Sequence, residues 1–156
     1  MNTAECLVKK LTESGQSIST AESCTGGMIA SRIVDVSGAS QVFEEGYVTY
    51  SNRIKQKLLG VQTETLARYT EVSSQTAEEM AAGMAEAAGT DLALSVTGYA
   101  GPDNGEDGTP AGTVYIGTCY HGTVLSRKYC FGGDRQQVRE QAAEEALRFA
   151  LERIQN

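Results

Sequence analysis

The chain has 156 residues, of which 40 % are hydrophobic and 21 % are charged, a composition typical of a globular domain in water. Its formal net charge of −7 argues against the basic surface that nonspecific nucleic-acid binding needs. Because no apolar run approaches the roughly 18 residues that span a bilayer, and the first residues do not resemble a signal peptide, we expect one cytoplasmic domain over 1–156 with neither a membrane nor a nucleic-acid partner.

Helices are predicted where apolar residues recur every three or four positions, and strands where β-branched and aromatic residues cluster. In chain order, the predicted elements are a helix over 3–14, a strand over 17–21, a helix over 25–35, a strand over 42–50, helices over 52–59, 63–69 and 74–88, strands over 91–97, 113–120 and 123–131, and a final helix after residue 134. Capping residues support these boundaries. Thr25 is expected to cap the second helix, Ser51 and Gly60 to bound the third, and Asp134 to form a capping box with Gln137.

Helices that separate strands along the chain favour a layered α/β fold, and the hairpin over 113–131 adds at least one antiparallel strand. We therefore predict a three-layer α/β/α sandwich around a mixed, mostly parallel sheet. Ligands of such folds bind at the carboxyl ends of the strands. Ser23, Tyr50 and Thr97 all fall at such ends.

The four cysteines include no C-x-x-C pair, which argues against a thiolate zinc site. A two-residue turn at 121–122 would place Cys119 opposite Val124 and Cys130 opposite Thr113, too far apart for a disulfide. The one histidine, residue 121, excludes a three-histidine zinc site and sits in this turn, where a solvated side chain is a simpler interpretation than a catalytic triad. We expect no metal.

The segment 20–27, Thr-Ala-Glu-Ser-Cys-Thr-Gly-Gly, lies at a predicted strand-to-helix junction, where unpaired N–H groups can hold a developing negative charge. Ser23 is a candidate nucleophile, and with histidine nearly excluded its base must be lysine, a carboxylate or tyrosine. Lys55, one turn into the helix that follows Tyr50, is the best candidate. A plain turn or capping role for Ser23 is the alternative.

The neighbours of Ser23 have competing interpretations. Cys24 is either a rival nucleophile near a helix start or a small buried hydrophobe. Glu22 is either an acid, base or orienter of Lys55, or a carboxylate that stabilises the helix start. Thr25 can cap the helix or contact substrate. A second glycine-rich turn, 97–102, lacks the Gly-Lys-Ser/Thr of a Walker A loop, but its N–H groups can still meet an anion.

Taken together, these motifs resemble the CinA C-terminal domain family over about residues 3–153. The matching segments are Ala21–Gly27, Val48–Asn52 with Lys55, Leu58–Val61, Glu71–Ser73, Ser95–Gly98, Ala100–Pro102, Gly112–Tyr115 and Gly132 with Asp134 and Arg135. The resemblance is to the stand-alone, PncC-like members of this family.

The resemblance implies a three-layer α/β/α amidohydrolase that converts nicotinamide mononucleotide to nicotinate mononucleotide and ammonia, without metal or cofactor. It implies Ser23 as the nucleophile, Lys55 as the general base, and Tyr50 as a further catalytic residue. Substrate contacts are expected from residues of the first and second turns and from the start of the last helix: Glu22, Thr25, Gly26, Gly27, Thr97, Gly98, Gly101 and Arg135. Relatives commonly assemble, so a homo-oligomer is expected.

Three features depart from the usual family pattern. Glu71 replaces a small residue, Tyr99 replaces an aliphatic residue, and the loop 103–110 is acidic and lacks the lysine that often precedes its proline. Negative charge near a phosphate pocket weakens anion binding. Two alternatives therefore stand beside the amidohydrolase: a nucleotide-binding or regulatory relative without turnover, and an amidase for another carboxamide.

Overall fold

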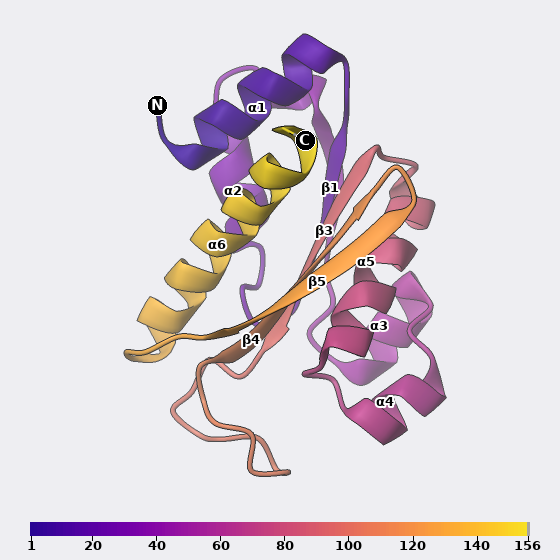
Figure 1. Ribbon diagram of the computed structural model, residues 1–156, viewed down its shortest axis with the longest axis vertical. Coiled ribbons are helices and arrows are strands. Elements are labelled where there is room, and N and C mark those ends of the chain that lie inside the picture. The colour runs from indigo at the N-terminus through magenta and orange to yellow at the C-terminus, as the bar shows by residue number, and fades with distance from the viewer. Residues whose placement is uncertain (156) are drawn as a thin grey trace.

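The computed structural model describes residues 1–155 and contains a five-stranded sheet with helices on both faces (Figure 1). The strands are β1 (Ile18–Glu22), β2 (Phe43–Val48), β3 (Leu92–Gly98), β4 (Thr113–Tyr120) and β5 (Thr123–Cys130). The helices are α1 (Thr3–Ser14), α2 (Met28–Val34), α3 (Asn52–Leu59), α4 (Thr63–Tyr69), α5 (Ser74–Ala88) and α6 (Arg135–Gln155), with a 3-10 turn at Ala39–Gln41. Among these residues, no helix is both long and apolar enough to cross a membrane.

The sheet has the strand order β2-β1-β3-β4-β5. β1 pairs in parallel with both β2 and β3, whereas β4 runs antiparallel to its two neighbours. Four of the five strands therefore point the same way, which confirms the predicted mixed, mostly parallel sheet.

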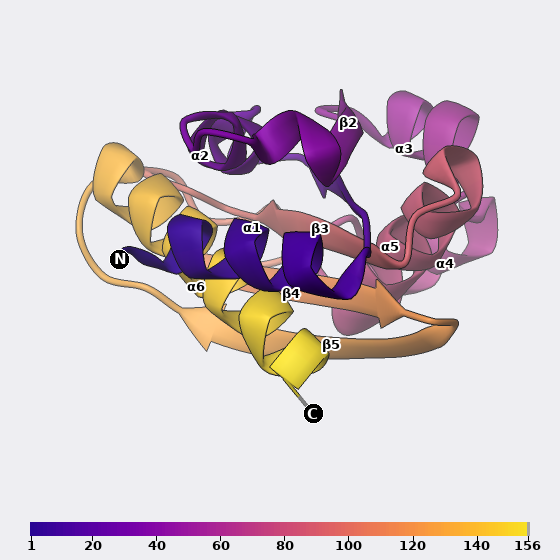
Figure 2. The same cartoon turned by 90° about the horizontal axis from the view of Figure 1, so that it is seen from above.

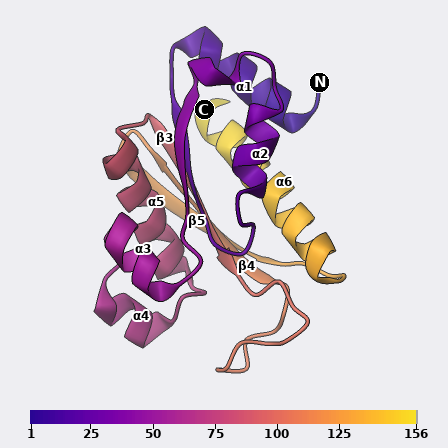
Figure 3. The same cartoon turned by 180° about the vertical axis from the view of Figure 1, so that it is seen from behind.

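The two faces of the sheet bury separate apolar clusters. Helices α1, α2 and α6 cover one face and α3, α4 and α5 lie on the other, as Figures 2 and 3 show. Alternate residues of β3 serve the two clusters, because successive side chains of a strand point to opposite faces. Leu92 and Leu94 join the first cluster and Ala93 the second. The molecule is thus the predicted three-layer α/β/α sandwich.

The β4–β5 hairpin has the predicted register. Cys119 lies opposite Val124 and Cys130 opposite Thr113, and all four cysteines are free. The turn is made by residues 121 and 122, both with positive φ, as a tight two-residue hairpin requires. The capping predictions at Ser51, Gly60 and Asp134 are also confirmed.

Close packing of α5 on α3 depends on Gly83. A Cβ added there would lie 1.8 Å from the carbonyl oxygen of Leu59, at the end of the helix that carries Lys55. We expect Gly83→Ala to lower the free energy of unfolding by about 3 kcal/mol, because backbone atoms must move to admit the methyl group. Urea denaturation measures this change. Gly132→Ala is the control, since a Cβ there meets nothing within 4 Å, and equal midpoints for the two variants would contradict the prediction.

Candidate active site

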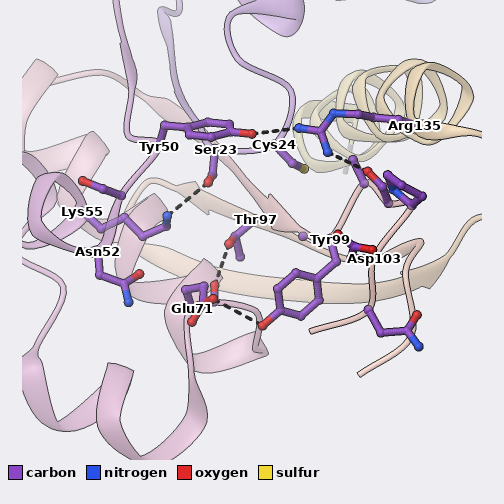
Figure 4. Close-up of a pocket in the computed structure, with 16 residues that line it drawn as sticks. Ser23, Cys24, Tyr50, Asn52, Lys55, Glu71, Thr97, Tyr99, Asp103 and Arg135 are labelled. Carbon is purple, nitrogen blue, oxygen red and sulfur yellow. Dashed lines mark hydrogen bonds between the residues drawn. The ribbon is translucent and has the colours of Figure 1, made fainter. Parts of the chain in front are cut away.

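A pocket of about 520 Å³ opens where β1, β2 and β3 end and the 99–112 loop begins (Figure 4). Seven of the predicted site residues line it: Ser23, Tyr50, Lys55, Thr97, Gly98, Gly101 and Arg135. Parallel strands bring these segments together because their carboxyl ends lie at one edge of the sheet.

Ser23 and Lys55 are in direct contact inside this pocket. Lys55 Nζ donates hydrogen bonds to Ser23 Oγ and to the carbonyl oxygen of Thr49, each at 3.1 Å. The Lys55 side chain is only 2 % exposed, although lysine is a residue that rarely leaves solvent. Helix α3, capped by Ser51, directs the lysine inward as one of its two buried residues.

The environment of Lys55 favours its neutral form. Burial lowers the pKa of its amine, and the negative charge of Glu71 opposes this shift only in part. A neutral amine within hydrogen-bond distance of a hydroxyl can accept its proton. The 3.1 Å contact and the lowered pKa of the amine therefore suit proton transfer from the Ser23 hydroxyl to Lys55.

Cys24 lines the same pocket, but its thiol is poorly suited to attack. Burial raises the pKa of the Cys24 thiol to about 11, so the thiol stays protonated near neutral pH. Because the thiolate is the reactive form, the structure favours the interpretation of Cys24 as a small buried residue.

The start of α2 differs from the prediction. The helix begins at Met28 with Gly27 in the capping position, and the buried hydroxyl of Thr25 has no hydrogen-bond partner within residues 1–155, so the capping role expected of Thr25 is wrong. Gly26 and Gly27 have φ values of 56° and 103°, and this left-handed turn lets the chain reverse between β1 and α2.

Glu22 caps α2 from the end of β1. Its carboxylate oxygens accept hydrogen bonds from the N–H groups of Ile29 and Ala30 at 2.9 and 3.0 Å, and the residue is 1 % exposed. Glu22 therefore stabilises the helix start, as the second interpretation expected, and it is not among the residues that line the pocket. Thr25, Gly26 and Gly27 also lie outside the lining of the pocket, and the Gly26 N–H already donates to the Ser23 carbonyl at 3.0 Å.

Arg135 connects three segments at the outer end of the pocket. Its guanidinium donates to the carbonyl oxygen of Gly101 at 2.7 Å and to the hydroxyl of Tyr50 at 2.9 Å. Both acceptors are neutral, so the arginine's charge remains free to meet an anion. Tyr50, 61 % exposed, orients Arg135 and makes no hydrogen bond to Ser23 or Lys55.

Arg139 is a site residue that the sequence analysis missed. It donates from Nε to the carbonyl oxygen of Cys24 at 2.9 Å and from Nη2 to that of Thr25 at 3.2 Å, and so fixes the loop that follows Ser23. One signal was present, because Arg139 lies four residues after Arg135 and therefore on the same face of α6.

Glu71 and Tyr99 form another wall of the pocket. The Tyr99 hydroxyl donates to Glu71 Oε1 at 3.3 Å, and the Thr97 hydroxyl donates to the Glu71 carbonyl oxygen at 2.6 Å. Burial and the charge of Glu71 raise the pKa of Tyr99 to about 12, so its hydroxyl remains a donor. Both residues depart from the usual family pattern, but no local sequence pattern predicts a contact between side chains 28 positions apart.

His121 lies away from the pocket. Its ring is 2.9 Å from the Gln16 amide nitrogen and 3.8 Å from an Asp91 carboxylate oxygen, beside the amino ends of β1 and β3. The site thus contains no histidine among its lining residues, as the sequence indicated.

Comparison with known proteins places the chain in a family. A family model described as the CinA C-terminal domain matches residues 1–154. A CinA-like protein of Kosmotoga olearia is 51 % identical over 145 residues, which make up 93 % of this chain and 35 % of that protein. The chain spans about a third of the length of the curated relatives of this kind. A protein of Enterobacter agglomerans named nicotinamide-nucleotide amidohydrolase PncC is 51 % identical over 135 residues, 86 % of this chain and 82 % of that protein.

Solved structures agree with this assignment. The competence damage-inducible protein A (ComA) from Klebsiella pneumoniae superposes with a TM-score of 0.96 at 38 % identity, covering 100 % of this chain and 99 % of that one. The competence/damage inducible protein CihA from Agrobacterium tumefaciens superposes with a TM-score of 0.94 at 38 % identity, covering 99 % and 94 %. The chain belongs to the CinA C-terminal domain family.

Proposed function

We propose that the protein hydrolyses the carboxamide of nicotinamide mononucleotide, releasing ammonia and nicotinate mononucleotide. The observation that carries the proposal is the buried contact of 3.1 Å between Lys55 Nζ and Ser23 Oγ, which supplies a nucleophile and a base. The choice of substrate is supported by the name of the relative from Enterobacter agglomerans, which matches most of both chains.

The reaction begins with the transfer of a proton from Ser23 to Lys55. As Lys55 Nζ accepts this proton, Ser23 Oγ bonds to the carboxamide carbon, and the carbonyl oxygen takes the negative charge. The resulting ammonium group then donates the proton to the departing nitrogen, so that ammonia leaves and an ester to Ser23 remains. The neutral Lys55 next takes a proton from water as the water oxygen attacks the ester carbon. When the bond between this carbon and Ser23 Oγ breaks, the ammonium group returns the proton to Oγ, which restores the serine hydroxyl and the neutral amine and releases nicotinate mononucleotide.

Backbone N–H groups beside Ser23 are the candidates to hold the oxyanion. Within residues 1–155, no other residue accepts a hydrogen bond from the N–H of Cys24. This residue lines the pocket and directly follows the nucleophile, the position that supplies one oxyanion donor in other serine hydrolases. Arg139 fixes the carbonyl groups of the same loop and so keeps these donors in place.

Arg135 is the proposed contact for the substrate phosphate. Its charge lies at the outer end of the pocket and has only neutral partners. Tyr50 and Gly101 hold the guanidinium in position, which supports a binding role for all three residues. The turn at 98–101 can add backbone N–H groups.

The test is ammonia release from nicotinamide mononucleotide by the purified protein, followed with a coupled assay and confirmed by chromatography of the nucleotide product. We expect turnover without added metal. If the protein binds the nucleotide but releases no ammonia, the result would favour a nucleotide-binding or regulatory function without turnover. If it releases ammonia only from a different carboxamide, the result would favour an amidase with another substrate. The expected homo-oligomer remains a prediction, which light scattering on the same preparation would test.

A further inference from the structure

One side of the pocket carries a carboxylate, that of Glu71, which forms no salt bridge within residues 1–155. Glu71 and Tyr99 line this side, which we call the acidic wall. In Figure 4, Glu71 and Tyr99 lie together on the far side of Ser23 and Thr97 from the contact between Arg135 and Tyr50. The pocket therefore has an anion-binding end and an anionic wall.

The Glu71 carboxylate is available to a ligand. Within residues 1–155 it lies in no salt bridge, and its one side-chain hydrogen bond is the 3.3 Å contact from Tyr99. Lys55 lines the same pocket, and burial lowers the pKa of its amine although the Glu71 charge opposes this shift in part. A half-buried carboxylate that forms no salt bridge favours a positively charged ligand, because pairing offsets the cost of its desolvation.

The acidic wall is held in place on both sides. The Thr97 hydroxyl binds the Glu71 backbone, and Thr70, just before it, has a φ of 67° stabilised by the hydroxyls of Ser73 and Thr76, which donate to the Thr70 carbonyl. Behind the Tyr99 ring, a Cβ added at Gly105 would come within 2.5 Å of the ring. The 103–109 loop therefore packs against Tyr99 and fixes its position.

We propose that the acidic wall recognises a positively charged pyridinium ring, so that the protein selects carboxamides of N-alkylated pyridinium compounds over neutral ones. The proposal rests on the proposed function, because it assumes that the carboxamide binds at Ser23. The ring nitrogen then lies within one ring width of that carboxamide, in the pocket that Glu71 and Tyr99 line. A cation beside a carboxylate and an aromatic ring is stabilised by both.

Two small probes that differ in ring charge test this directly. 1-Methylnicotinamide is a pyridinium cation and nicotinamide is its neutral counterpart, and neither carries ribose or phosphate. Binding is measured by ligand-observed NMR titration on the full chain carrying Ser23→Ala, which prevents turnover. We expect the cation to bind about tenfold more tightly.

Glu71→Gln, added to Ser23→Ala, identifies the source of the preference. We expect it to remove most of the tenfold difference while leaving nicotinamide binding unchanged. Tyr99→Phe, which keeps the ring and removes the hydrogen bond to Glu71, should remove part of it. Glu64→Gln, an exposed carboxylate on α4, is the matched control for net charge and should keep the full preference.

An indirect effect through Lys55 would have the opposite sign. Loss of the Glu71 charge lowers the pKa of Lys55 further. A less protonated amine repels a cation less, so this route would strengthen binding of 1-methylnicotinamide. A weakened preference in Glu71→Gln therefore reports the acidic wall itself.

Equal affinity of the two probes, an unchanged preference in Glu71→Gln, or binding of neither probe would each overturn the proposal. Failure of the proposed function appears in a different measurement. If the protein prefers the pyridinium probe but releases no ammonia from nicotinamide mononucleotide, the result would support recognition by the acidic wall and refute the proposed reaction.

Discussion

Lys55→Met should lower kcat/KM for nicotinamide mononucleotide by about 10³-fold, the scale of a lost general base. Methionine is unbranched and fills a similar buried volume, but it cannot accept a proton from Ser23. The change in the free energy of unfolding should be small, because two effects oppose each other. The variant removes a buried amine whose desolvation was unfavourable, but it also leaves the Thr49 carbonyl without one donor.

The control for this variant is Lys57→Met, two residues further along α3 and exposed. It removes the same formal charge and should keep activity within about twofold, because surface substitutions rarely perturb a fold. Denaturant unfolding of both variants separates lost chemistry from lost folding. Retention of a tenth or more of the activity by folded Lys55→Met would remove Lys55 from the mechanism.

The protonation of Lys55 should determine how kcat/KM depends on pH. The neutral amine is the active form, so kcat/KM should rise with pH through a limb that reports the pKa of Lys55, below the ordinary value for lysine. Because Glu71 raises this pKa, Glu71→Gln should move the limb to lower pH. A shift to higher pH, or a limb that persists in Lys55→Met, would show that another group titrates.

Ser23→Ala should abolish detectable turnover, a loss of about 10⁴-fold or more, because no covalent intermediate can form. Addition of Lys55→Met to Ser23→Ala should cost almost nothing further, since a nucleophile and its base act as one unit. Binding of the nucleotide should survive in Ser23→Ala, because the proposed phosphate contact, Arg135, is intact.

Cys24→Ala is the matched control for the serine variant. The Cys24 thiol is buried and held protonated, so its removal should leave kcat within a fewfold of the original. Mass spectrometry of protein quenched during turnover should find an ester of nicotinate mononucleotide on the peptide that contains Ser23. Loss of turnover in Cys24→Ala together with activity in Ser23→Ala would reverse the two assignments.

Local sequence determines several helix ends and the register of the hairpin. The capping residues Ser51, Gly60 and Asp134 bound their helices as expected, because caps depend on hydrogen bonds between neighbours in the chain. The hairpin register followed from its two-residue turn, which fixes every cross-strand pair. The prediction for Thr25 was wrong because the Glu22 carboxylate, at the end of β1, accepts the hydrogen bonds from the N–H groups of the first turn of α2.

In the pocket, too, local sequence predicts some features and only tertiary packing decides the others. Strand ends and turns were enough to nominate Ser23 and Lys55, because the carboxyl ends of parallel strands meet at one edge. Their distance, the burial of the amine and the pairing of Glu71 with Tyr99 arise from groups 28 to 32 residues apart, and the anchoring of the Ser23 loop by Arg139 spans more than 100. Local patterns specify which elements form. The proton affinity of Lys55 and the partners of Glu71 depend on which distant side chains surround them and exclude water. Only the packing of the three layers determines which side chains these are.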